Sequence, residues 1–307
     1  MRRAIAAAAV FSAFSIASQA HAQSPIPPSS AKALRESLLK ADRALSAAVV
    51  RKGMGAAFGD VVSPDAIFLY DGAPIIAGGA NIVALLNAQP TLAGTRIEWF
   101  PLVGAVSSDG SLGSTWGVVS VRPVASQAES AMHFGKYIST WRRTASGAWQ
   151  LASYVEMGVS DQKVVIPASL AQTSLPTRNP QSGNGAPFAK ADIEFARMAG
   201  ANGAPAAFGA FAAPDAMTLP GTGEIVVGPT AINLRMLESP AAKAKWEWHP
   251  VYSEGSATGD LGFTIGEATI AIPGPSGLTD YKSKYLTIWR RQPDGSIRYI
   301  VDGGNGR

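Results

Sequence analysis

The chain has 307 residues, of which 47% are hydrophobic and 16% are charged, and its formal net charge is +4. This length has room for two domains that each bury a core, and the composition excludes a largely disordered chain. The mild positive charge comes without a run of Lys and Arg, which argues against a nucleic-acid partner. The absence of cysteine excludes disulfides, thiolate nucleophiles and cysteine-containing metal sites.

The first 22 residues have the pattern of a secretory signal peptide. Arg2 and Arg3 precede an uncharged apolar run over 4–17, and residues 20–22 form a small-x-small cleavage site. We expect cleavage after Ala22, which leaves a net charge of +2 and no membrane span, in a periplasmic or secreted protein. The alternative is an uncleaved membrane anchor, for which the apolar run is short.

An internal repeat dominates the rest of the chain. Residues 56–66 return 150 residues later as residues 206–216, with seven of the eleven positions identical. The similarity extends along both flanks, at offsets of 149 and 148 in later segments. The sequence therefore predicts two copies of one domain, with small loop deletions between them.

The elements of the first copy follow in chain order. After a flexible lead-in over 23–30, domain 1 is expected to span 31–159. Apolar residues at helical spacing predict helices. Runs in which apolar and polar residues alternate, bounded by turn residues, predict strands. The predicted helices cover 31–53, 55–62 and 81–87, and the predicted strands cover 66–70, 74–77, 96–103, 112–124, 132–143 and 149–156.

A Pro-rich segment over 160–187 is predicted to link the copies, and domain 2 is expected to span 188–307. Its elements follow in the same order. Helices are predicted from 188 and over 205–211 and 230–238, and strands over 216–219, 224–228, 245–252, 261–272, 282–291 and 297–302. The fold class is α+β, with three N-terminal helices packed on a mostly antiparallel sheet in each copy.

Several short motifs resemble the nuclear transport factor 2-like superfamily, with the SnoaL-like and DUF4440 domains as the nearest branch. They are Pro-Asp-Ala before the first strand, Gly-Pro-Thr-Ala-Ile over 228–232, and Tyr-x-x-x-Trp-Arg-Arg over 137–143 and 285–291. The resemblance implies a cone-shaped domain with a curved sheet and an apolar pocket. It also implies that domain 1 packs against domain 2 as an intramolecular pseudo-dimer. Some similar proteins are ketosteroid isomerases or polyketide cyclases.

Asp42 and Asp192 occupy equivalent positions and are the best candidates for catalytic residues. Each lies on the apolar stripe of the first helix of its copy, so each carboxylate is expected inside the cone. A carboxylate there could act as a general base or as a neutral hydrogen-bond donor. The competing interpretation is that each aspartate only holds a nearby loop.

The candidate ligand-binding residues come from the strands. Tyr137 shares a strand face with Trp141, and Tyr285 shares one with Trp289. If this face is concave the pairs line the pocket, and if it is convex they form the contact between the copies. His249, on the same face as Glu247, is a further candidate, opposed by the interpretation that it is a surface residue.

Other polar residues are expected to be solvated: Arg142, Arg143, Arg290 and Arg291 beside hairpin turns, with anion recognition as the alternative, and Glu156 and Asp302 at the ends of the last strands, which could also reach the pocket mouth. The copies differ at Tyr70 and Pro220, Phe100 and His249, and Trp116 and Ile265, which predicts unequal pockets.

Three functional hypotheses follow. The first is an exported protein that binds a small apolar or amphipathic molecule without a cofactor or a metal. The second is a cofactor-independent isomerase or cyclase with a pocket aspartate as base, and the third is a scaffold with filled cones.

Overall fold

The computed structural model describes residues 28–89, 92, 94–126, 128, 131–168, 170, 184–274 and 277–307. The predicted signal peptide, residues 23–27 of the predicted lead-in, and residues 169 and 171–183 of the predicted linker lie outside the described residues.

Within the described residues, domain 1 consists of helices packed on one sheet. The helices are α1 (Pro28–Lys52), α2 (Met54–Gly59) and α3 (Gly79–Ala88), and the strands are β1 (Val62–Leu69), β2 (Ile76–Ala77), β3 (Thr95–Val106), β4 (Leu112–Pro123), β5 (His133–Arg143) and β6 (Trp149–Ser160). The strand order is β2-β1-β6-β5-β4-β3, in which β1 runs parallel to β6 and the other neighbours are antiparallel.

Domain 2 repeats this arrangement. It contains α5 (Ala186–Asn202), α6 (Ala204–Phe211), β7 (Ala212–Thr218), β8 (Val226–Val227), α7 (Pro229–Leu237), η2 (Pro240–Lys243), β9 (Lys245–Gly255), β10 (Leu261–Gly274), β11 (Gly277–Arg291) and β12 (Ile297–Gly306). The strand order β8-β7-β12-β11-β10-β9 matches that of domain 1. The α+β class and the tandem domains expected from the sequence are confirmed.

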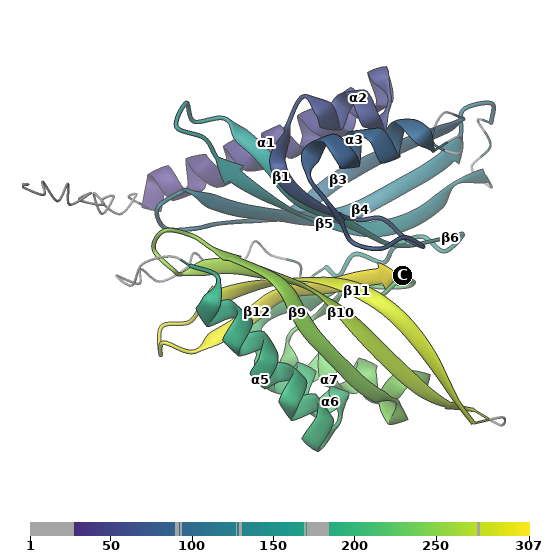
Figure 1. Ribbon diagram of the computed structural model, residues 1–307, viewed down its shortest axis with the longest axis vertical. Helices are drawn as coiled ribbons and strands as arrows, with labels where there is room; N and C mark the ends of the chain where they lie inside the picture. The colour runs from purple at the N-terminus through teal and green to yellow at the C-terminus, as the bar shows by residue number, and fades with distance from the viewer. Residues whose placement is uncertain are drawn as a thin grey trace, which may run out of the picture.

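The two sheets face each other in the middle of the molecule, and the helices of each domain cover its outer side (Figure 1). One hydrophobic core continues across this contact, with Ile138, Val155 and Met157 of domain 1 in the same cluster as Met217 and Val301 of domain 2. The indole of Trp116 donates to Met217 Sδ at 3.1 Å.

Bulges at equivalent positions bend both sheets. The register shifts near Pro101 in β3 and near Pro250 in β9, and again before Trp141 in β5 and before Trp289 in β11. A bulge adds a residue to one strand and bends it, so this repeated pattern gives both sheets their concave face.

Reciprocal loop contacts join the domains. The Ser108 N–H donates to Asp260 Oδ2 at 3.0 Å, and the Thr258 N–H donates to Asp109 Oδ2 at 3.1 Å. Arg142 also crosses the contact, donating to both carboxylate oxygens of Glu254 at 2.6 Å.

The prediction that the hairpin arginines are solvated is therefore wrong for Arg142, and it is also wrong for Arg290, whose side chain is 4% exposed and ion-paired to Asp215. Arg142 pairs in the same way with Asp65, so the Trp-Arg-Arg and Pro-Asp-Ala motifs meet in both copies. The position of an arginine beside a turn does not reveal acidic partners that are distant in the sequence.

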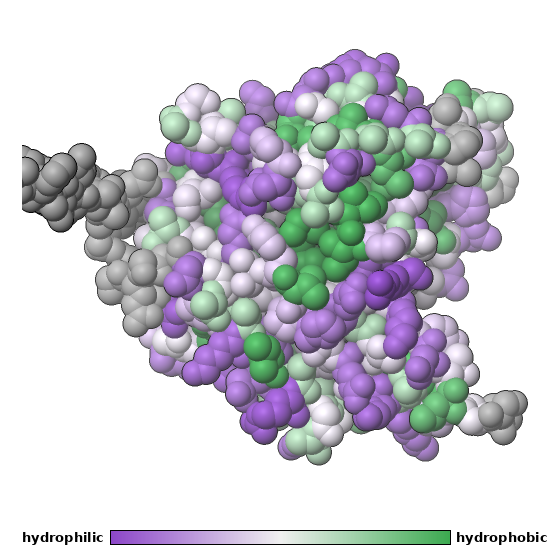
Figure 2. Space-filling view, in the orientation of Figure 1, coloured by the Kyte–Doolittle hydropathy of each residue, from purple (hydrophilic) through white to green (hydrophobic). Residues whose placement is uncertain are grey.

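Figure 2 shows hydrophobic side chains gathered over α3 and the β1–β2 hairpin of domain 1, whereas domain 2 is mostly hydrophilic in this view. Over the described residues, no helix is both long enough and apolar enough to span a bilayer.

Candidate functional site

A buried aspartate connects the first helix of domain 1 to the sheet. Asp42 Oδ1 accepts a hydrogen bond from Trp99 Nε1 at 2.7 Å, and Oδ2 accepts one from the Tyr137 hydroxyl at 2.6 Å. Burial raises the pKa of Asp42, against the opposing effect of these hydrogen bonds. The helix is thereby fixed to β3 and β5 by one side chain.

Domain 2 contains the same group. Asp192 Oδ1 accepts from Trp248 Nε1 at 2.8 Å and Oδ2 accepts from the Tyr285 hydroxyl at 2.9 Å. Gly266 makes room for this contact, since a Cβ there would lie 2.2 Å from the Tyr285 hydroxyl oxygen. Because Tyr285 reaches the helix, its strand face is the concave one.

The interior of domain 1 is filled with aromatic rings. Tyr154 on β6 lies at its centre, with ring centroids 5.4 Å from Phe58, 5.5 Å from Phe68 and 5.8 Å from Tyr137. Its hydroxyl donates to Glu156 Oε1 at 2.8 Å. These contacts occupy the space in which a ligand would lie.

Domain 2 has a cavity of about 500 Å³, open to solvent on one side, in the corresponding place. Strand register pairs Tyr154 with Ser139 and Asp302 with Thr287, so Asp302 occupies the position of Tyr154 in the repeat. Thr218 occupies the position of Phe68, at the repeat offset of 150 residues. Two large rings of domain 1 are thus replaced by two small polar side chains, and the cone is left hollow.

The last strand of domain 2 carries its aromatic ring at a different position from the last strand of domain 1. Tyr299 occupies the position of Leu151 and packs against Phe195 at 5.7 Å and Phe208 at 6.1 Å. Its hydroxyl donates to the Phe208 carbonyl at 2.8 Å. The ring therefore lies against α5 and α6 and is not among the residues that line the cavity.

Asp302 is the acidic group in the lining of the cavity. Thr287 Oγ1 donates to Asp302 Oδ2 at 2.6 Å. Burial raises the pKa of Asp302 to about 7, and the nearby Asp192 acts in the same direction. Near neutral pH this side chain can therefore either accept or release a proton.

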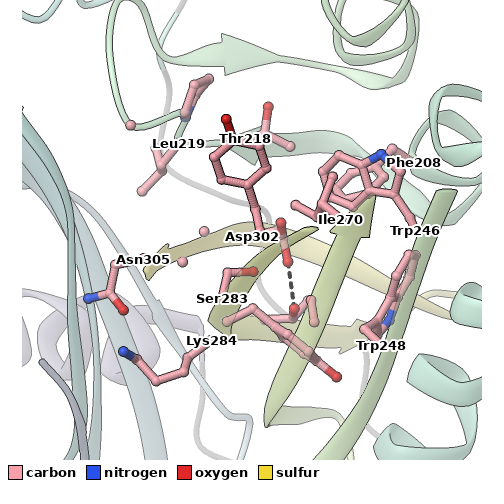
Figure 3. Close-up of a pocket in the computed structure, with 18 of the residues that line it drawn as sticks. Phe208, Thr218, Leu219, Trp246, Trp248, Ile270, Ser283, Lys284, Asp302 and Asn305 are labelled. Atoms are coloured by element: carbon pink, nitrogen blue, oxygen red, sulfur yellow. Dashed lines mark hydrogen bonds between the residues drawn. The ribbon is translucent and has the colours of Figure 1, made fainter. Parts of the chain in front are cut away.

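The cavity has an aromatic side and a polar side. In Figure 3, Trp246, Trp248 and Phe208 lie across the cavity from Asn305 and Lys284, and Asp302 lies between them. A ligand with one apolar end and one polar end matches this distribution.

The structure places the predicted catalytic residues behind the site. Asp192 lies behind Tyr285 and Trp248, which line the cavity, and both of its oxygens accept hydrogen bonds. Asp42 lies in the filled domain, as does Tyr137. Both aspartates thus connect a helix to the sheet, and of the predicted residues Tyr285 lines the cavity.

The other predicted ligand-binding residues lie away from the cavity lining. Trp289 packs on Phe195 and donates to Thr264 Oγ1 at 2.8 Å, and Trp141 is buried in the core of domain 1. His249 is exposed, because on β9 it points opposite to Trp248.

The sequence favoured a solvated Asp302 and left open a position at the pocket mouth, and the structure places Asp302 in the cavity lining. Asn305 was not among the candidates drawn from the sequence. The available signal was the repeat itself, since at an offset of 148 residues Asp302 coincides with the aromatic Tyr154. Among the described residues, no group of three or more His, Asp and Glu side chains could hold a metal ion.

No protein-family model matches the chain, and no curated protein matches it either. Several solved structures are similar to about two fifths of it. An NTF2-like protein with a cystatin-like fold from Novosphingobium aromaticivorans is 20% identical and covers 42% of this chain and 85% of its own, with a TM-score of 0.33. A candidate polyketide cyclase from Xanthomonas campestris pv. campestris is 14% identical, and the match covers 40% of this chain and 90% of the cyclase chain, with a TM-score of 0.30. A domain of unknown function from Nostoc punctiforme, also with a cystatin-like fold, is 13% identical and covers 40% and 76%, with a TM-score of 0.33. The NTF2-like fold expected from the sequence is the type of fold named among these structures.

Proposed function

We propose that domain 2 binds a small apolar or amphipathic molecule in its cavity and that domain 1 supports it with a filled cone. The observation that carries this proposal is the exchange of Phe68 and Tyr154 for Thr218 and Asp302 at equivalent positions of one repeated fold. A cavity of about 500 Å³ is in the range of small-molecule sites. Residues 1–22 support the further proposal that binding takes place in the periplasm or outside the cell.

Refilling the cavity tests the proposal. The double substitution Thr218→Phe and Asp302→Tyr gives domain 2 the two rings that already pack together in domain 1. We expect the neutral naphthalene dye prodan to bind the wild-type chain with enhanced fluorescence and to lose at least tenfold in affinity in the double variant. That loss corresponds to about 1.4 kcal/mol.

The control adds a ring outside the cavity. Thr269→Phe places it on β10, at a residue that does not line the cavity, and should leave dye binding unchanged. Equal binding by the double variant, with circular dichroism unchanged, would show that the dye binds elsewhere and would remove the basis of the proposal.

Asp302 favours a second candidate function, which is proton transfer to or from a bound carbon acid. A general base works best when its pKa lies near the working pH, and that of Asp302 is about 7. In this proposal the carboxylate removes a proton next to a carbonyl group and returns it at a neighbouring position, without a cofactor.

Exchange of the α-protons of 2-tetralone in D₂O, followed by NMR, tests this second candidate. We expect the exchange to rise as Asp302 ionises and to fall to the buffer rate in Asp302→Asn. Exposed Asp280→Asn is the control. If wild-type protein exchanges no faster than buffer, the binding function stands without the proton transfer.

A further inference from the structure

The third helix of each domain presents one stripe of side chains to the inside of its cone. In domain 1, Ile82 and Leu86 on α3 are buried, and Leu85 packs against the same aromatic core. Residues three or four positions apart share one face of a helix, so these side chains form a single stripe. In the filled domain this stripe is entirely apolar.

Arg235 lies on the same stripe in domain 2. It follows the buried Ile232 of α7 by three positions, and at the repeat offset of 150 residues it takes the place of Leu85. Arg235 and its neighbour Met236 line the cavity. The arginine is exposed, so it lies where the cavity opens to solvent. Here too the hollow domain has a polar residue where the filled domain packs an apolar one.

The guanidinium of Arg235 has its donors available. Over the residues that the structure describes, it makes no hydrogen bond and no ion pair, even with Glu238 three positions later. The hairpin arginine Arg142 differs, because it pairs with Glu254. A guanidinium presents its N–H groups in a planar fork that fits the two oxygens of a carboxylate. The open side of the cavity therefore offers a site for an anionic group.

The other charged groups of the lining do not cancel this positive charge. Lys282 donates to Thr269 Oγ1 at 2.8 Å, and the ammonium of Lys284 donates to three carbonyl oxygens. Both lysines alternate with Tyr285 along β11, so their side chains point to the sheet face opposite to the cone. Asp302 is the acidic residue of the lining, and burial raises its pKa to about 7, which leaves it largely neutral at mildly acidic pH. The balance of charge around the cavity is therefore positive.

We infer that the molecule bound by domain 2 is an amphipathic carboxylate, with its anionic end on Arg235 at the open side of the cavity and its apolar body against Trp246 and Trp248. This inference rests on the proposed function of domain 2. The aromatic side of the cavity favours a flat apolar body. A carboxylate at the open side gains a charge-assisted contact and keeps part of its hydration, so the pairing costs little desolvation.

A matched pair of probes tests the inference. 2-Naphthoate and 2-naphthamide have nearly the same shape and differ in charge. At about pH 5.5 the naphthoate is ionised, because an ordinary carboxyl pKa is about 4, whereas Asp302 largely keeps its proton and does not repel the probe. By calorimetric titration we expect the wild-type chain to bind 2-naphthoate about fivefold more tightly than 2-naphthamide, as one partly exposed ion pair would produce.

Variants at exposed positions assign the preference. Arg235→Gln removes the charge from a position that tolerates a polar side chain, and should bring the two affinities to within about twofold of each other. Arg235→Lys keeps the charge without the planar fork and should retain a preference for 2-naphthoate. Lys243→Gln is the control, because it removes the same charge from η2, outside the cavity lining, and should leave the preference in place.

The outcomes separate the inference from the proposed function. If neither probe binds the wild-type chain, the proposed function itself fails. If 2-naphthamide binds as tightly as 2-naphthoate or more tightly, domain 2 still binds small molecules but the carboxylate class is overturned, and this result needs no variant. A preference for 2-naphthoate that survives Arg235→Gln overturns the role of Arg235, because another cation would then hold the anionic end.

Discussion

Because the two domains are copies of one fold, equivalent residues of the filled and the hollow domain can be compared directly. Asp42 and Asp192 make the same two hydrogen bonds in a filled domain and in a hollow one. A group that is identical with and without a cavity is best explained by its role in holding helix to sheet. Asp302 has no acidic counterpart in domain 1, so its chemistry belongs to the cavity.

The ionisation of Asp302 should change stability with pH in a defined direction. Its pKa is about 7 in the folded chain, against an ordinary value near 4 when unfolded, so the folded state retains a proton that the unfolded state releases. The free energy of unfolding should therefore fall as the pH rises from about 4 to about 7, by up to roughly 1.4 kcal/mol for each pH unit.

Urea unfolding of the wild-type chain and of Asp302→Asn between these pH values measures this effect. The variant lacks the ionisable group and should gain stability relative to the wild type as the pH rises. Asp280→Asn, on an exposed part of β11, should follow the wild type. Parallel curves for wild type and Asp302→Asn would contradict the raised pKa.

At the scale of elements, strand β12 differs from its counterpart β6 in the residues that lie at the cavity. Gly303 and Gly304 take the positions of Val155 and Glu156, so the strand passes the cavity without side chains there. A Cβ on Gly304 would lie 2.1 Å from the Lys284 carbonyl oxygen, which prevents a larger residue without a backbone shift. The same strand carries Asp302, the acidic residue of the lining.

At the scale of the whole molecule, each domain holds the other through a buried lysine. Lys136 donates to the Pro220 carbonyl at 2.7 Å, and Lys284 donates to the carbonyls of Tyr70 and Ala73. Burial lowers the pKa of both lysines, to about 8 for Lys136. Pro220 and Lys284 also line the cavity, so the contact between the domains shapes the site.

The two lysines should differ in their effect on stability. Lys284→Met removes three hydrogen bonds to carbonyl oxygens, whereas Lys136→Met removes one. We expect Lys284→Met to lower the free energy of unfolding by roughly 3 kcal/mol and Lys136→Met by roughly 1 kcal/mol. Urea unfolding measures both, and an equal or reversed order would show that the carbonyl contacts do not stabilise the domain contact.

The architecture of the protein was predictable from its sequence. The repeat predicted two domains with the same elements in the same order along the chain, and the helical spacing around Asp42 and Asp192 predicted that both are buried. These features follow from local periodicity, which a single chain displays directly. The shared face of Tyr137 and Trp141 was also predictable, because side chains alternate along a strand.

Which cone is hollow, and which residues line it, depends on how the elements pack together. A period of two residues tells which side chains share a face, but the packing of α1 and α5 determines which face is concave. A cavity is a difference between the volume that the backbone encloses and the volume that all inward side chains fill. Asp302, Asn305 and Arg142 were misjudged or missed because their surroundings come from distant strands and from the other domain, through contacts that local sequence does not encode.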